Sequence, residues 1–309
     1  MSPPPSTTST PLSRFLGPRY WPVWLGLALI RVVMLLPFPA ILGCGRAVGR
    51  LAYLVSRREK HIARVNIALC LPELGPDARE QLVRRHFEAL GCAVFETGLV
   101  WWESDERLNR WVRLEGTEHL ARALEAGKGA ILLSAHFTCL EMGARALTMH
   151  TPTSIMYMVP RNPLIAELAR RSRGRHAVRA IASDQVRDIL RSLGENLTVW
   201  YAPDQRYTEK MSAIVPFFGQ PAATNIATSR LARISGARVL PYFPERLADG
   251  SGYVMRIGAP LEDFPSDDPV ADALRFHALI EAHVRRSPEQ YLWTYKRLKL
   301  PGPQGDVYR

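Results

Sequence analysis

From residue 112 onward, the sequence alternates short apolar runs with stretches in which apolar residues recur at helical spacing. The short runs predict buried strands, and the helical spacing predicts amphipathic helices. The expected strands cover residues 112–115, 129–134, 153–158, 178–182, 196–202, 238–243 and 252–257. The expected helices lie near residues 117–126, 138–148, 163–173, 184–193, 223–235 and 269–286. This alternation is typical of a single α/β sandwich with a largely parallel sheet.

The N-terminal region has a different pattern. Residues 1–17 begin with a segment rich in Pro, Ser and Thr, and we expect them to be disordered. Residues 18–43 are strongly apolar, but Arg31 interrupts them, so the clean run is short for a membrane-spanning helix. We expect a membrane-associated or transmembrane helix here, with Trp21 and Trp24 at the membrane interface. A core helix of a soluble protein is the alternative.

Residues 44–101 are predicted to be helical, because apolar residues recur at helical spacing along this stretch. Gly43, Gly45 and Gly49 are best explained as small residues that let two helices pack closely. Arginine and lysine are more frequent after the apolar stretch than before it. If that stretch crosses a membrane, this bias places the C-terminal body in the cytoplasm.

The composition favours an anionic partner. The 309 residues include 40 Lys and Arg against 29 Asp and Glu, which gives a net charge of +11. The sequence has no zinc-finger spacing and no aromatic RNA-binding motif, and its basic residues are dispersed. We therefore expect a membrane surface or a phosphorylated lipid as partner, and no nucleic acid. The four cysteines are widely spaced without a CxxC pair, which indicates reduced thiols.

The strongest chemical signal is the pair His136 and Glu141, which follows the expected strand 129–134. Ligands usually meet side chains at the carboxyl end of a strand in an open α/β sheet. With His136 in the turn and Glu141 one helical turn further, the carboxylate can reach back to the imidazole. The pair then acts as a general base and its orienting group. The alternative is a satisfied histidine at the rim of the core and a solvated glutamate.

Several further boxes carry a resemblance to a known family. They are the HxxxxE box at 136–141, MVPRNPL at 158–164, YAPDQ at 201–205, VPFFGQPAAT at 215–224 and SRLARISGARVLPYFP at 229–244. In this order they resemble the late acyltransferases of lipid A biosynthesis, the lauroyl or HtrB-like branch of the lysophospholipid acyltransferase superfamily. The resemblance extends over about residues 18–300 and makes residues 44–309 the acyltransferase catalytic domain.

The resemblance implies transfer of a fatty acyl chain from acyl carrier protein to a hydroxyl on the 3-hydroxyacyl chain of a lipid A precursor. His136 would withdraw the hydroxyl proton directly, so neither a covalent acyl-enzyme nor a cofactor is needed. His136 and Glu141 lack the HExxH spacing of a zinc site, and we expect no metal. The implied location is the inner membrane, with the catalytic domain on the cytoplasmic side.

Basic residues further along the chain are candidates for substrate binding. Arg161 follows an expected strand at its carboxyl end, where it could stabilise an oxyanion or hold a phosphate. The next helix carries a dense cluster, Arg170, Arg171, Arg173 and Arg175. A phosphorylated glycolipid or an acidic carrier protein would suit this cluster. The alternatives are a surface arginine in a loop and a solvated helix face.

Two more groups complete the expected site. Asp204 and Gln205 end a strand and face the same sheet edge as His136. Many members of the resembled family carry DQD at this place, whereas this chain has Arg206 in the third position, which puts any role of a second carboxylate in doubt. Phe217, Phe218 and Gly219 resemble one wall of an acyl groove, and their alternative is an ordinary cluster that anchors a loop.

Two other functions stay open on the sequence alone. An acyltransferase of the same superfamily with a glycerolipid or another glycolipid as acceptor would carry the same HxxxxE box. A membrane lipid-binding protein without turnover would share the fold but would need neither His136 nor Glu141.

Overall fold

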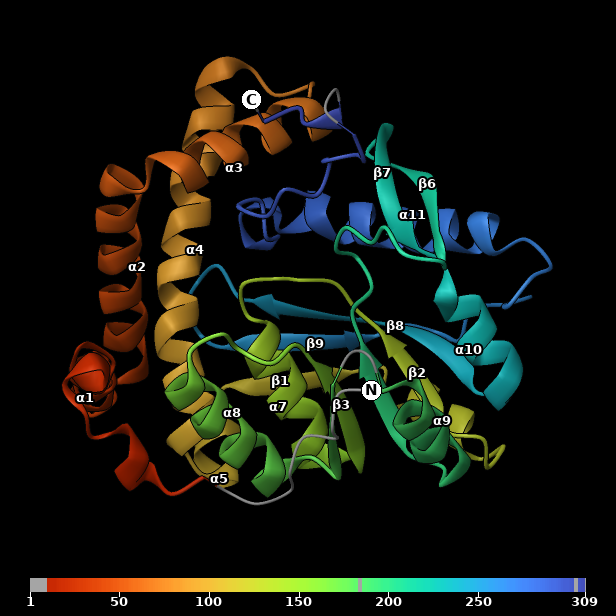
Figure 1. The fold of residues 1–309 in the computed structure, drawn as a ribbon, viewed down its shortest axis with the longest axis horizontal. Helices are drawn as coiled ribbons and strands as arrows, with labels where there is room; N and C mark the ends of the chain where they lie inside the picture. The colour runs from red at the N-terminus through yellow and green to blue at the C-terminus, as the bar shows by residue number, and fades with distance from the viewer. Residues whose placement is uncertain (1–9, 183–184, 303–304, 309) are drawn as a thin grey trace.

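The computed structural model describes residues 10–182, 185–302 and 305–308, which form one α/β body with helices stacked along one side (Figure 1). A seven-stranded sheet lies at its centre, in the order β1-β9-β8-β2-β5-β3-β4. The strands are β1 (Val112–Glu115), β2 (Ala130–Leu133), β3 (Thr153–Tyr157), β4 (Arg179–Ala182), β5 (Thr198–Tyr201), β8 (Arg238–Arg246) and β9 (Tyr253–Ile257). Neighbouring strands are parallel except β8 and β9.

Helices cover the sheet as the strand–helix alternation predicts. They are α6 (Thr117–Leu124), α7 (Leu140–His150), α8 (Pro163–His176), α9 (Val186–Gly194), α10 (Ala227–Ser235) and α11 (Pro269–Arg286). The α/β class, the largely parallel sheet and every strand expected in the sequence are confirmed. The expected helices are found too, with ends shifted by a few residues except at α10.

A two-stranded hairpin outside the main sheet was missed. It consists of β6 (Ser212–Phe217) and β7 (Gln220–Asn225), which pair antiparallel. The helix expected over residues 223–235 therefore begins only at Ala227. The reason is that β7 is built from small residues such as Ala222 and Ala223, which lack the alternating pattern of a strand.

The N-terminal helices pack against the long helix α4, which runs beside the sheet (Figure 1). The N-terminal helices that pack on α4 (Pro76–Trp102) are α1 (Trp21–Val33), α2 (Phe38–Val55) and α3 (Arg57–Cys70), and the short helix α5 (Asp105–Leu108) follows α4. The single apolar helix expected over residues 18–43 is wrong, because α1 ends at Val33 and α2 starts afresh after Pro37 and continues to Val55.

Part of the segment expected to be disordered is ordered. Residues Leu12–Phe15 form a 3-10 helix, and the Phe15 side chain is buried. The Trp24 indole donates a hydrogen bond of 2.7 Å to the Phe15 carbonyl. Trp24 is therefore engaged inside the protein, whereas Trp21 is 63% exposed. Residues 1–9 of the expected disordered segment lie outside the described residues.

Two of the three glycines assigned to helix packing do pack tightly. A Cβ on Gly49 would lie 2.2 Å from the Phe87 carbonyl oxygen, and one on Gly45 would lie 2.7 Å from the Cys92 Cα. On the α4 side, a Cβ on Gly91 would lie 2.1 Å from the Gly45 carbonyl oxygen. These contacts allow α2 and α4 to approach backbone to backbone. Gly43 has open space around it and takes no part.

The outer sides of α1 and α2 expose apolar side chains. On α1 they recur at helical spacing, and the exposed residues are Trp21, Leu25, Leu29 and Val32. On α2 the exposed apolar residues are Val48, Leu51, Leu54 and Val55. We refer to these eight residues as the α1–α2 apolar face. Among the described helices, α2 is the one long and apolar enough to cross a membrane.

Candidate active site

The site is built at the carboxyl ends of three neighbouring parallel strands. In the register of β2 and β5, Leu133 lies opposite Tyr201, and Ile155 of β3 lies opposite Trp200 on the other side of β5. His136 follows β2 and Asp204 follows β5, so the topology brings the two residues to one edge of the sheet. This is the edge at which open α/β sheets bind their ligands.

Asp204 holds His136 with both carboxylate oxygens. His136 Nδ1 lies 2.6 Å from Asp204 Oδ1, and the His136 backbone N–H donates a 3.0 Å bond to Oδ2. An ionised carboxylate accepts only, so Nδ1 carries the proton and donates it, which leaves Nε2 as the basic nitrogen. The expectation that Glu141 orients the imidazole is thus wrong in this structure, because Asp204 occupies that position.

The electrostatics of the pair favour its charged form. Burial disfavours the imidazolium, but the charge of Asp204 and its hydrogen bond outweigh this effect and raise the pKa of His136. Burial likewise disfavours the carboxylate, yet the charge of His136 and the bonds from it lower the pKa of Asp204. Asp204 is therefore suited to stabilise the imidazolium that forms when His136 takes a proton.

Glu141 belongs to a second charged pair beside the first. Its carboxylate lies 2.5 Å from the Arg173 guanidinium, which reaches over from α8. The guanidinium also lies over the Tyr157 ring, 4.9 Å from its centre. Tyr157 lines the same cavity as His136, so the Arg173–Glu141 pair contacts one residue of the cavity wall, although neither of its members lines the cavity itself. The α7–α8 contact, and not a contact within α7, explains the place of Glu141.

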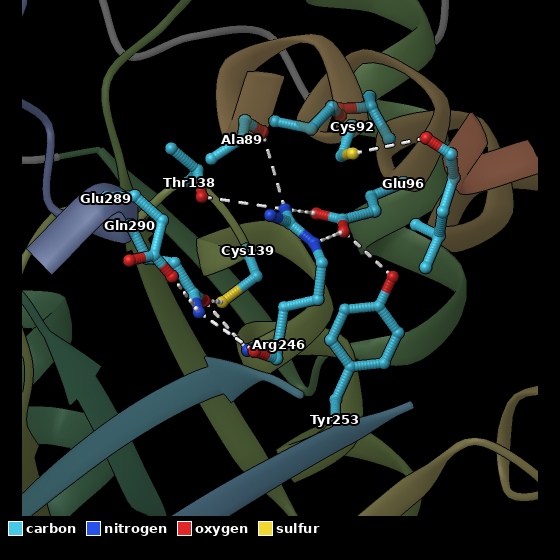
Figure 2. Close-up of polar contacts among 12 residues, drawn as sticks. Ala89, Cys92, Glu96, Thr138, Cys139, Arg246, Tyr253, Glu289 and Gln290 are labelled. Carbon is cyan, nitrogen blue, oxygen red and sulfur yellow. Dashed lines mark hydrogen bonds and ion pairs between the residues drawn. The ribbon is translucent and has the colours of Figure 1, made fainter. Parts of the chain in front are cut away.

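The turn after His136 is fixed by backbone bonds to the C-terminal segment. The Thr138 N–H donates to the Gln290 carbonyl at 2.7 Å, and the Leu292 N–H donates to the His136 carbonyl at 3.0 Å. The Gln290 side chain in turn exchanges two 2.8 Å bonds with the backbone of Arg246 on β8. Figure 2 shows this arrangement around Gln290 and Arg246.

A buried ion pair supports the same region from the side of α4. The Arg246 guanidinium binds both carboxylate oxygens of Glu96, and the Tyr253 hydroxyl donates to Glu96 at 2.8 Å (Figure 2). Arg246 also reaches the Thr138 hydroxyl at 3.5 Å. The network therefore connects α4, both antiparallel strands and the turn that carries His136.

His136 opens into a cavity of about 400 Å³. Aromatic and apolar side chains form much of its wall, namely Met156, Tyr157, Met158, Trp200, Tyr201, Ala202, Pro203 and Tyr207. Its polar lining consists of His136, Gln205, Arg206, Glu209 and Asn225. Of the residues expected at the site, His136 and Gln205 line the cavity directly, and Asp204 is buried behind His136.

The arginines of α8 face two ways. Arg173 turns to Glu141 and Tyr157, whereas Arg170, Arg171 and Arg175 line a separate hollow of about 500 Å³ with Trp101 and Trp102. Arg170 and Arg171 both bind the Glu167 carboxylate. Arg175 donates to the Trp101 carbonyl at 2.8 Å. These three arginines are thus partly engaged within the protein, although their hollow is open to solvent.

Arg161 is exposed in the loop between β3 and α8 and does not line the cavity with His136. Phe217, Phe218 and Gly219 lie at the turn of the β6–β7 hairpin, also away from this cavity. The Phe217 ring packs on His277 and Tyr291, and the Phe218 N–H donates to Glu281 of α11 at 2.6 Å. These residues anchor the hairpin, which is the alternative stated for them above, and they do not line the cavity of His136.

Sequence reasoning missed most of the cavity wall. Trp200, Tyr201 and Arg206 were not assigned, although they flank Asp204 at the end of β5. The signal that could have identified them is their position at the carboxyl end of a strand, because side chains on both sides of that end lie at the ligand-binding edge of the sheet. No cluster of metal-binding side chains occurs among the described residues.

Known proteins that are similar to this chain come from one family. The profile of the bacterial lipid A biosynthesis acyltransferase family matches residues 10–300. The lipid A biosynthesis palmitoleoyltransferase and lauroyltransferase of Escherichia coli (strain K12) are each 36% identical to the chain. The first match covers 95% of this chain and 96% of the relative, and the second covers 94% and 95%. The lipid A biosynthesis myristoyltransferase of the same organism is 28% identical, and the match covers 94% of this chain and 90% of the relative.

Proposed function

The chain belongs to the bacterial lipid A biosynthesis acyltransferase family and transfers acyl chains onto lipid A precursors, and from this premise we propose its donor, its acceptor group and its catalytic residues. The donor is an acyl thioester of acyl carrier protein. The acceptor is the hydroxyl of a 3-hydroxyacyl chain already attached to the precursor. The observation that carries the proposal is the His136–Asp204 pair, of which His136 lines the cavity.

His136 acts as the general base. A hydroxyl is a weak nucleophile until a base withdraws its proton during attack on the thioester. Asp204 accepts a hydrogen bond from the Nδ1–H of His136, so Nε2 is free to take the proton of the hydroxyl. The oxygen then attacks the thioester carbonyl, and loss of the thiolate completes the transfer. The imidazolium next gives its proton to the leaving sulfur, and His136 is neutral again.

Arg173 supplies positive charge for the oxyanion that forms on the attacked carbonyl. Glu141 fixes one edge of its guanidinium, and stacking on Tyr157 fixes the plane. A preorganised charge of this kind stabilises a transition state without reorganisation. Arg161, exposed after β3, is the other candidate for an oxyanion or phosphate contact. Gln205 contacts substrate within the cavity.

The hollow beside α8 binds an anionic part of the substrates. It combines Arg170, Arg171 and Arg175 with two tryptophans, which suits a phosphorylated sugar or the acidic carrier protein. Only one carboxylate, that of Glu167, neutralises these arginines among the described contacts. The hollow therefore keeps an excess of positive charge.

We further propose that the enzyme works at the inner membrane, with the catalytic body on its cytoplasmic side. The α1–α2 apolar face supports contact with the hydrocarbon region, since it exposes eight apolar side chains on adjacent helices. Arg57, Arg58 and Lys60 follow α2 directly. Basic residues next to a membrane helix favour the cytoplasmic side.

The decisive experiment compares purified parental protein with His136→Ala, using acyl carrier protein loaded with chains of several lengths and a tetraacylated precursor. Loss of the base should lower kcat by about a hundred- to ten-thousandfold, with the product identified by its mass. His150→Ala, on the end of α7, provides the matched control and should retain full turnover. Parental rates in His136→Ala would overturn the mechanism, and the absence of product with every donor in the parental protein would overturn the donor assignment.

A further inference from the structure

Among the described residues, Arg206 is the one arginine that lines the cavity of His136. Its Nε donates a 2.7 Å hydrogen bond to the Lys299 carbonyl, which fixes the side chain against the C-terminal segment. Among the contacts of the described residues, its two terminal nitrogens take part in no hydrogen bond and no ion pair. Both terminal nitrogens of this cavity-lining guanidinium are therefore available to a ligand.

Nearby carboxylates do not neutralise this charge. Glu209 also lines the cavity, but it lies at the exposed rim, where its carboxylate accepts a 3.1 Å bond from the Tyr207 hydroxyl. Asp204 is buried and bound by His136. The Lys299 ammonium, on the residue whose carbonyl holds Arg206, pairs with Asp306. Arg206 therefore differs from Arg170, Arg171 and Arg173 of α8, each of which pairs with a carboxylate.

A fixed guanidinium with a free edge is chemically specific. Its parallel N–H donors match the oxygens of a phosphate and bind them in bidentate fashion. A purely apolar acyl chain would gain nothing from this group and would leave its charge desolvated. The aromatic wall formed by Tyr157, Trp200 and Tyr207 would enclose such a phosphate next to the reacting atoms.

We propose that Arg206 forms a phosphate-binding subsite within the catalytic cavity, which holds a phosphate group of a substrate while His136 acts on the hydroxyl. The subsite rests on the proposed function and deepens it by naming what the cavity recognises besides the acyl chain. Two sources of phosphate are compatible with it, the phosphorylated sugar of the acceptor and the phosphopantetheine arm of the donor.

Steady-state kinetics of Arg206→Gln separates these sources. Loss of a charge-assisted bond should raise one KM by about ten- to a hundredfold and leave kcat within about threefold. The acceptor is the source if its KM rises with the phosphorylated precursor and is unchanged with a dephosphorylated one. The donor arm is the source if its KM rises with acyl carrier protein and is unchanged with a phosphate-free acyl-pantetheine. Arg206→Lys should recover part of the loss, because lysine keeps the positive charge but lacks the two parallel N–H donors of a guanidinium.

Arg122→Gln on α6, an exposed arginine, is the control and should match the parental enzyme. A KM that rises equally with and without phosphate, or does not rise at all, would overturn the subsite. Equilibrium binding of the phosphorylated and dephosphorylated precursors to parental and Arg206→Gln protein, measured without donor, tests Arg206 independently of turnover. Failure of acyl transfer in the parental protein would therefore affect the proposed function and leave the test of Arg206 intact.

Discussion

Asp204 Oδ1 lies 2.6 Å from His136 Nδ1, although the two residues are 68 positions apart in the chain. The distance is short because β2 and β5 are adjacent and parallel, so that the loops after them begin side by side. This contact assigns the orienting role to a residue that no local spacing around His136 would indicate. It also gives the site a defined pH behaviour.

Asp204→Asn should weaken catalysis and move its pH dependence. Asp204 raises the pKa of His136 above the ordinary histidine value of about 6.5. The acidic limb of the kcat/KM profile of the parental enzyme should therefore lie above that pH. Without the negative charge this pKa falls, and the acidic limb of the kcat/KM profile should move to lower pH. The plateau should drop by about a hundred- to ten-thousandfold, because an amide no longer fixes the productive tautomer. Asp267→Asn, at an exposed position, should leave both features unchanged.

An acidic limb that stays in place in Asp204→Asn would show that His136 does not titrate under control of Asp204. Profiles of kcat/KM between about pH 5 and 9 cover the ordinary histidine range on both sides. Far-ultraviolet circular dichroism of each variant establishes that the fold is retained.

The Glu141–Arg173 pair should behave differently from the His136–Asp204 pair. Glu141→Gln and Arg173→Gln should each lower kcat, and the double variant should be little worse than the poorer single variant, since the two groups act as a unit. Neither single change should move the acidic limb, because Glu141 binds Arg173 and not the imidazole. A shift in Glu141→Gln as large as that in Asp204→Asn would return Glu141 to the role of orienting group.

The sequence predicted the central sheet well because buried parallel strands are encoded locally. The run of Ala130 to Leu133 and its counterparts form short apolar blocks, and the helices between them show amphipathic spacing. The sequence did not predict the hairpin of β6 and β7, because its strands contain small residues and prolines. The break between α1 and α2 was not predicted either, because two consecutive helices with apolar faces give one nearly continuous apolar stretch in the sequence.

The candidate site was only partly predictable for a related reason. His136 was found from its position after a strand, and Asp204 was placed at the same edge from the end of another strand. Their contact depends on the order of strands in the sheet, which the sequence does not state. The same limit applies to Phe217, whose pattern was compatible with a groove wall and with a packing anchor.

The α1–α2 apolar face should control membrane binding. Deletion of residues 1–42 would be a poor test, because Ile41 and Leu42 are fully buried in the core. Replacing Leu25, Leu29 and Val32 with asparagine changes exposed positions only, and each side chain lost would contribute up to about 1.5–3 kcal/mol if buried in lipid. Co-sedimentation with anionic vesicles should therefore fall strongly. Polar replacements at exposed Val186 and Ile234 form the control, and equal sedimentation of both variants would rule out this face.

The Glu96–Arg246 ion pair should be a major determinant of stability. Both side chains are buried, and removal of one partner leaves an uncompensated charge at a cost of about 3–5 kcal/mol. Glu96→Gln should therefore lower the Tm by roughly 5–8 °C for a chain of this size. Joint replacement by apolar residues, Glu96→Leu with Arg246→Leu and Tyr253→Phe, should restore much of this loss, because no charge then stays buried without a partner.

The exposed pair Arg285–Glu73 is the matched comparison, since both of its side chains are about half exposed. Arg285→Gln should change the free energy of unfolding by less than about 1 kcal/mol. Thermal unfolding followed by circular dichroism gives each Tm, and urea titration gives the free energies. Because Arg246 also reaches Thr138 beside the catalytic turn, Glu96→Gln should in addition lower kcat at temperatures where the fold is intact. A Tm for Glu96→Gln no lower than that for Arg285→Gln would show that the buried network does not stabilise this end of the sheet.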